Sequence, residues 1–140
     1  MVQKLWMVLA FSLLLACQKT ENVAPTPLPP LSDSFALISS SNFTSLNGYT
    51  VTGKLDVWKD GNQYEFRFID FFASNGPDVD VWITTGQSTS SFIDLGDIKG
   101  HDGNFSYAYT DTDNRLKDFS SVLIWCKRFS RGFGIANFNQ

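Results

Sequence analysis

The chain has 140 residues, and its formal net charge of −3 predicts a mildly acidic surface. The sequence has no basic stripe, so it lacks the charge pattern of a nucleic-acid-binding protein, and no nucleic-acid partner is expected. Hydrophobic residues make up 43% of the chain, and thirteen of them are phenylalanines. This is enough apolar material for the core of one domain.

Residues 1–16 predict an export signal. Lys4 supplies a positive charge, and the apolar run from Leu5 to Leu15 is too short to span a bilayer as a permanent helix. The run ends in Leu14-Leu15-Ala16-Cys17, which resembles the lipobox of bacterial lipoproteins. The resemblance implies cleavage before Cys17, acylation of its sulfur and attachment to the lipid bilayer of a bacterial cell envelope. An ordinary signal peptide with an incidental cysteine is the alternative. Gln18, in place of Asp, favours the outer membrane over the inner one.

Residues 17–34 predict a tether that begins at the acylated cysteine. Four prolines, at positions 25, 27, 29 and 30, fall within this stretch. Proline-rich chain favours the extended polyproline II conformation, at about 3.1 Å per residue. A tether of this length can hold a domain up to roughly 50 Å from the bilayer.

Residues 35–140 read as a β domain. Apolar and polar residues alternate over 50–58 and again over 63–68, and Asp60-Gly61-Asn62 between them predicts a tight hairpin turn. The alternation breaks over 69–72, which indicates a β-bulge or a strand buried on both faces. Further strands are expected over 79–84, 105–109, 121–126 and 133–138.

Only residues 111–119 differ from this pattern. Leu116 and Phe119 are three residues apart, and Asp113 or Asn114 can cap a single helical turn. The sequence therefore predicts an all-β domain, an antiparallel β-sandwich or flattened barrel of about seven to nine short strands.

The order of these pieces resembles the electron-transfer DM-thirteen domain family. The segments that carry the resemblance are, in chain order, 48–68, Asp70-Phe71, Gly76-Pro77-Asp78, Val79-Asp80-Val81, Asp94-Leu95-Gly96, Ile98-Lys99-Gly100, Gly103-Asn104, Tyr107, Trp125-Cys126 and Phe133-Gly134. The resemblance covers roughly residues 35–140. It implies a redox or electron-transfer activity centred on Cys126, as a free thiol or as the ligand of a prosthetic group such as haem.

Cys126 has two interpretations on its own chemistry. Cys17 is the only other cysteine, so once that residue is acylated no intramolecular disulfide is available to Cys126. A reactive thiol needs positive charge nearby, and Arg128, two residues on, is expected on the same strand face. Val122 and Ile124 share that face as well, which favours an inert, buried cysteine.

The remaining candidate sites are weaker. His101 is the only histidine, and a haem or metal site shared with Cys126 lacks an attachment motif, so a solvated turn residue is the plainer reading. Two ligands are too few for a structural zinc site. Residues 111–114 carry oxygen ligands but lack the glycine and glutamate of a calcium loop. Asp78 and Asp80 alternate beside a turn, which predicts a solvated face. No motif of a hydrolase is present.

Two functions therefore remain open. The first is a redox or electron-transfer module that uses Cys126. The second is a non-catalytic surface module that binds a protein or a glycan through loops or exposed aromatic residues such as Trp58 and Trp82. Exposure of these tryptophans beside a groove would favour binding, whereas a cavity against Cys126 would favour redox chemistry. Trp125, within the apolar run 122–125, is expected to be largely buried.

Overall fold

The computed structural model describes residues 25–140. The predicted signal peptide, the predicted acylation site Cys17 and the first part of the predicted tether lie outside the described residues. Within residues 25–140, no helix has the length and apolar character needed to cross a membrane.

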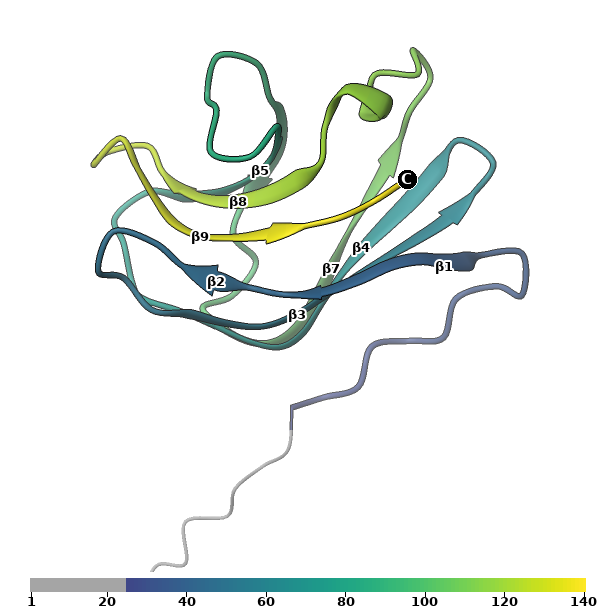
Figure 1. Cartoon of the computed structure of the whole chain (residues 1–140). Helices are drawn as coiled ribbons and strands as arrows, with labels where there is room; N and C mark the ends of the chain where they lie inside the picture. Colours follow the sequence, from purple (N-terminus) through teal and green to yellow (C-terminus); the bar gives the residue numbers. More distant parts are fainter. Residues whose placement is uncertain (1–24) are drawn as a thin grey trace, which may run out of the picture.

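Two antiparallel sheets pack face to face and form an open β-sandwich, which confirms the predicted fold class and decides against a closed barrel (Figure 1). One sheet has four strands in the order β1-β3-β4-β7, and the other has five in the order β2-β9-β8-β5-β6. The strands are β1 (Ala36–Asn42), β2 (Thr44–Ser45), β3 (Val51–Asp60), β4 (Gln63–Ala73), β5 (Val79–Thr84), β6 (Ile93–Asp97), β7 (Asp102–Thr110), β8 (Ser121–Cys126) and β9 (Arg131–Asn137).

The predicted hairpin and bulge are both present in the four-stranded sheet. Strands β3 and β4 pair from Asp60 opposite Gln63, with Gly61 in the turn at a φ of +58°. The register between β3 and β4 shifts near Gly53. The register between β4 and β7 shifts near Asp70, which has a φ of +46°. The break in alternation at residues 69–72 therefore marks a bulge, which bends the strand and changes which side chains face inward.

Aromatic side chains of the four-stranded sheet form a stacked cluster in the core. Phe66 and Phe68 are completely buried, and Phe68 stacks on Phe43 and Phe105 with ring centroids 5.2 and 4.8 Å apart. Offset and edge-to-face pairs at these separations add to the free energy gained from burial alone. The alternating phenylalanines of β4 thus form the inner face of this sheet, as the sequence pattern predicts.

The C-terminal strands β8 and β9 lie at the centre of the five-stranded sheet. Val122 and Ile124 of β8 face the core, whereas Trp125 points outward and is half-buried. Trp125 therefore lies on the outer face, where its stack on Trp82 leaves it only partly exposed. A register shift opposite Trp125 adds one residue to β9, which is why both Phe133 and Gly134 are buried.

The predicted helical turn is the 3-10 helix η1 (Leu116–Asp118). Its N-cap residue is Arg115, so the prediction of Asp113 or Asn114 as the cap is wrong. The carboxylate of Asp111 accepts hydrogen bonds from the backbone N–H groups of Arg115 and Leu116, at 2.8 and 3.0 Å. Asp111 is buried and can reach these donors because the chain turns between it and the helix, so it satisfies the first N–H groups of η1 without being its N-cap residue.

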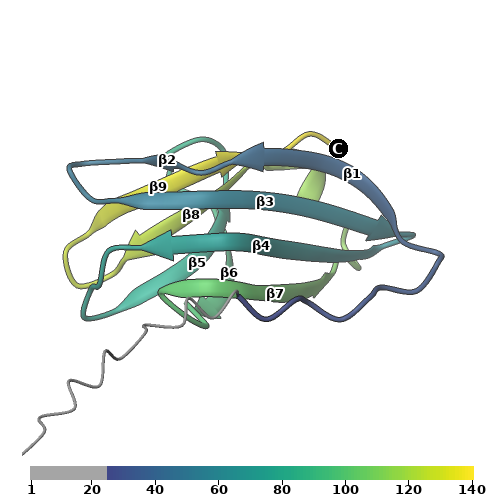
Figure 2. The ribbon, with the colours of Figure 1, turned by 90° about the horizontal axis from the view of Figure 1, so that it is seen from below.

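Residues 25–34, the described part of the predicted tether, run along the four-stranded sheet (Figure 2). The side chain of Arg67 donates to the carbonyl oxygen of Pro29, and Asn104 donates to that of Thr26 at 2.9 Å. This part of the chain therefore contacts the outer face of the domain.

Candidate functional site

Cys126 is the last residue of β8 and is completely buried. Its side chain belongs to the core cluster together with those of Val122 and Ile124, as the alternation along β8 predicts. Its cross-strand partners are Val79 on β5 and Arg131 on β9. The thiol is thus enclosed by apolar side chains, in the environment of a small hydrophobic residue.

The cationic neighbour expected for Cys126 is absent from its face. β8 ends at Cys126, and residues 127–130 form a turn in which Arg128 is exposed. A residue beyond the end of a strand no longer follows the two-residue alternation, so the face predicted for Arg128 is wrong.

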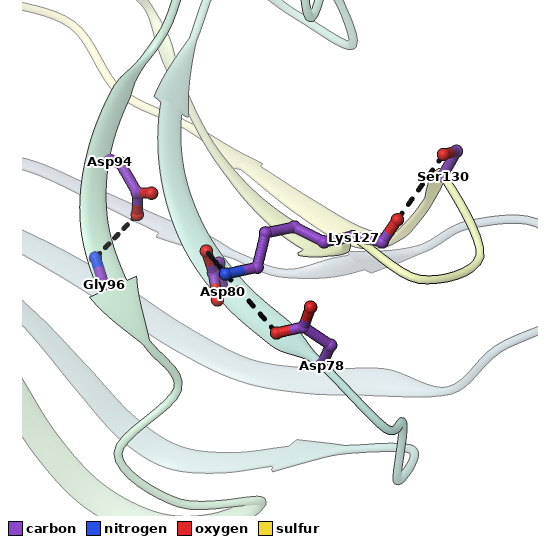
Figure 3. Close-up of polar contacts among 6 residues, drawn as sticks. All are labelled: Asp78, Asp80, Asp94, Gly96, Lys127 and Ser130. Carbon is purple, nitrogen blue, oxygen red and sulfur yellow. Dashed lines mark hydrogen bonds and ion pairs between the residues drawn. The ribbon is translucent and has the colours of Figure 1, made fainter.

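Lys127, the residue after Cys126, ties the end of β8 to the start of β5 (Figure 3). Its ammonium nitrogen lies 2.9 Å from Oδ2 of Asp80 and 3.3 Å from Oδ1 of Asp78. Its backbone N–H donates to the carbonyl oxygen of Asp78 at 2.9 Å. Hydrogen bonding to Asp80, aided by Asp78, raises the pKa of Lys127 above its usual value. We call these contacts the Lys127 clamp. They lie next to Cys126 and Val79, which are opposite each other on β8 and β5.

Asp80 does not lie on a solvated face as the sequence pattern suggests. Only 1% of its surface is exposed, because Lys127 covers it on one side and β6 pairs with it on the other. Its Oδ1 atom is buried and has no hydrogen-bond partner among the described residues. Asp78, by contrast, is partly exposed, so only one of the two carboxylates behaves as predicted.

His101 lies in the bend between β6 and β7 and is partly exposed. Its carbonyl oxygen accepts a hydrogen bond from the backbone of Ala73 at 2.8 Å. Its Nδ1 atom is buried and has no partner among the described residues. No contact joins His101 to Cys126, so the structure does not bring the two candidate ligands together.

A haem does not fit at Cys126 in this structure. Bonding of the sulfur to a haem iron requires the macrocycle to lie beside Cys126, where the core is packed with completely buried residues such as Phe133 and Ile124. Neither Cys126 nor His101 lines the pockets beside Trp125, Gly53 and Trp58. The residues present therefore do not form a haem site.

The tryptophans named as binding candidates are covered to different extents. Trp82 is only 7% exposed, because its ring stacks between Phe92 and Trp125 with centroids 3.8 and 5.2 Å away. The expectation of an exposed Trp82 is therefore wrong. Trp58 is partly exposed and lines a pocket together with Arg67, Phe35 and residues 30–33.

A second pocket opens on the outer face of the five-stranded sheet. It has a volume of about 270 Å³ and is lined by Trp125, by polar side chains and by neighbouring backbone. The residues that line it are Asn47, Gln87, Leu123, Trp125, Ser130, Arg131 and Gly132. Since Trp125 is held by its stack on Trp82, its ring is a preformed wall of this pocket.

The fold and the buried thiol define a class of protein, an all-β sandwich domain with a single cysteine in its described part. The comparison with known families is more specific. Residues 42–138 match the model of the family described as Electron transfer DM13, so the chain belongs to that family, which confirms the resemblance read from the sequence. No curated protein and no solved structure matches the chain.

Proposed function

We propose that this protein is an envelope lipoprotein whose DM13 domain takes part in electron transfer, with Cys126 as its redox group. The observation that carries the proposal is the match to the electron-transfer family over residues 42–138. Cys126 is the single cysteine among residues 25–140, and no haem site accompanies it. Thiol chemistry is therefore the redox chemistry that these residues support best.

The burial of Cys126 determines which step must come first. A thiol reacts as its thiolate and needs contact with its partner, so a fully buried sulfur must first become accessible. Cys126 lies at the end of β8, directly before the turn of residues 127–130. The Lys127 clamp holds this turn against β5. Opening of this turn would release the end of β8 while the rest of the sandwich stays folded, because local openings require less free energy than global unfolding.

The chemical step that we propose is thiol–disulfide exchange with a partner protein that carries a disulfide. The exposed thiol of Cys126 loses its proton, and its sulfur attacks one sulfur of the partner's disulfide. A new S–S bond forms, the partner's S–S bond breaks, and the leaving sulfur takes the electron pair as a thiolate. Because the described part of the chain has no second cysteine, the product is an intermolecular disulfide.

The role of the Lys127 clamp can be tested through the reactivity of Cys126. We expect Lys127→Gln to react several-fold faster than the wild-type protein with a small alkylating agent under native conditions. The substitution removes both ion pairs but keeps a polar side chain only one atom shorter, so the turn opens more often. The measurement is the rate of Cys126 modification by mass spectrometry.

The matched control for this experiment is Lys117→Gln. Lys117 is an exposed lysine of η1 that makes no ion pair with any residue in 25–140. Its substitution should leave the rate of Cys126 modification unchanged. Equal rates in wild type and Lys127→Gln would show that the clamp does not control access to the thiol.

The anchor is the second part of the proposal. The apolar run before Cys17 and the tether that follows support attachment to the bilayer by acyl chains on Cys17, at the outer membrane. Two or more acyl chains make a stable anchor, whereas one chain binds only marginally. The tether would let the domain meet partners at a distance from the lipid surface.

Replacement of Cys17 tests this anchor directly. We expect Cys17→Ser to be left uncleaved or to be released from the membrane fraction, because serine has no sulfur to receive the lipid. Fractionation followed by mass spectrometry of the N-terminus measures both outcomes. A wild-type mature N-terminus that carries an unmodified Cys17 would contradict the lipoprotein assignment.

A second function, a non-catalytic binding module, has one observation in its favour. The pocket beside Trp125 combines a fixed aromatic wall with the side chains of Asn47, Gln87 and Arg131. Aromatic surface together with a few convergent polar groups is the usual composition of a ligand site. Under this alternative Trp125 and Arg131 carry the function, and Cys126 is a packing residue.

A further inference from the structure

Three carboxylates converge on the outer face of the five-stranded sheet, at the edge where β5 pairs with β6. One oxygen from each of Asp78, Asp80 and Asp97 lies within 4.8 Å of the others. Oxygens that bind one Ca²⁺ ion at about 2.3–2.6 Å are separated by at most about 5 Å. The spacing of these three oxygens therefore suits a shared calcium ion.

The charge within this cluster is not balanced by the protein. Lys127 is the only basic side chain in the described residues that forms ion pairs with it, and its single charge opposes three negative ones. The cluster together with Lys127 therefore keeps a net charge of −2, and one of its carboxylates, Asp80, is only 1% exposed. Buried charge is expensive unless it is paired, so a divalent cation would complete the neutralisation.

An independent observation comes from Asp80 itself. Its Oδ2 atom is bound by Lys127, but its Oδ1 atom is buried and has no hydrogen-bond partner among the described residues. Such an oxygen in a native protein commonly indicates a water or an ion that binds there. The second carboxylate oxygen of Asp80 thus remains free for a ligand while Lys127 holds the first.

The backbone of β6 is shaped to bring Asp97 to this position. Asp80 lies opposite Asp97, while Trp82 lies opposite Asp94, so β6 has one more residue than β5 between the two pairs. Gly96, within that bulge, has a φ of +95°, and its N–H donates to Oδ1 of Asp94 at 2.8 Å (Figure 3). Bulges of this kind redirect side chains next to functional sites.

We propose that Asp78, Asp80 and Asp97 form a binding site for a divalent cation of the calcium class. All three ligands are carboxylates, which calcium prefers, and Asp97 and Asp78 leave the site open to solvent on one side. Lys127 stays on Asp78 and Asp80, and the metal binds the remaining oxygens. With three carboxylates and a neighbouring ammonium, the expected dissociation constant is about 10⁻⁴–10⁻³ M, as in extracellular calcium modules.

The site can be tested by terbium luminescence in the full-length wild-type protein. Tb³⁺ replaces Ca²⁺ in oxygen sites, and Trp125, directly opposite Asp80 on β8, is placed to sensitise its emission. We expect saturable emission on excitation of tryptophan, and its displacement by millimolar CaCl₂ but much less by MgCl₂, because magnesium demands a stricter geometry. Absence of a saturable signal, or a signal that CaCl₂ does not displace, would overturn the proposal.

Two variants and a control make the assignment specific. Asp97→Asn should lose the signal, because it removes one ligand charge without breaking an ion pair of Lys127. Lys127→Gln should bind several-fold more tightly, because the competing ammonium is gone. Asp60→Asn, at the hairpin between β3 and β4, should bind like the wild type. Wild-type binding by Asp97→Asn, with an unchanged thermal melt in the absence of metal, would place the ion elsewhere and refute the site.

Discussion

Substitution of Cys126 is expected to abolish electron exchange while the domain remains folded. Cys126→Ala and Cys126→Val keep the apolar character of a side chain that is completely buried, so the sandwich should tolerate both. Cys126→Ser keeps the size but buries a hydroxyl, at a cost of about 1–3 kcal/mol. All three variants lack the sulfur, so none can form the proposed intermolecular disulfide.

The measurement is the capture of mixed disulfides in the native host. Cells are treated with a thiol-blocking reagent, and the protein is analysed on non-reducing gels. Wild type should give a band of higher mass that disappears on reduction, and the three variants should give none. If Ala and Val variants retain the wild-type band, Cys126 is a packing residue, and the pocket beside Trp125 becomes the better candidate for function.

The largest effect on stability is expected at Gly53. Its φ of +107° disfavours any residue with a Cβ atom. An added Cβ would also lie 2.7 Å from Cα of Phe71, 2.8 Å from the carbonyl oxygen of Asp70 and 2.9 Å from that of Ile69. These are backbone atoms of the neighbouring strand, which cannot rotate away as a side chain does. Strain and overpacking together predict that Gly53→Ala loses about 3–5 kcal/mol of unfolding free energy.

A matched glycine separates the two causes. Gly61 also has a positive φ, +58°, but an added Cβ there would meet nothing within 4 Å. Gly61→Ala should therefore cost only the backbone strain, about 1–2 kcal/mol. Urea unfolding followed by tryptophan fluorescence compares the two variants. Equal midpoints would show that the close approach of β3 to the bulge in β4 adds nothing to the loss of stability in Gly53→Ala.

The sequence was a good guide where local pattern decides structure. Alternation over β3 and β4 and the Asp60-Gly61-Asn62 turn predict the central hairpin correctly, because a two-residue period and a tight turn depend on neighbours in the chain. β1 and β6 have weaker patterns and were not predicted as separate strands. As edge strands of their sheets, each pairs on one side only and needs less regular burial.

The candidate site was harder to predict because it depends on contacts between distant segments. The inward orientation of Cys126 follows from alternation along β8 and is confirmed. The burial of Asp80 cannot be predicted from the residues next to it in the sequence. It requires Lys127, from the turn after β8, and the bulge of β6. The outward orientation of Trp125 also follows from alternation, yet hydrophobicity alone suggested burial.

The most direct test of the electron-transfer role is a spectroelectrochemical titration of the full-length protein purified from its native host. Absorbance is recorded from the ultraviolet to the near infrared while the potential is stepped, and Cys126→Ala is measured alongside. The protein is first treated with oxidised glutathione, which supplies the disulfide that the chain lacks. The proposed thiol chemistry predicts no haem band, together with a Cys126–glutathione mixed disulfide that takes up two electrons to give two thiols and is missing in Cys126→Ala. Electron uptake of equal size in both proteins, or none in the wild type, would contradict a redox role for Cys126.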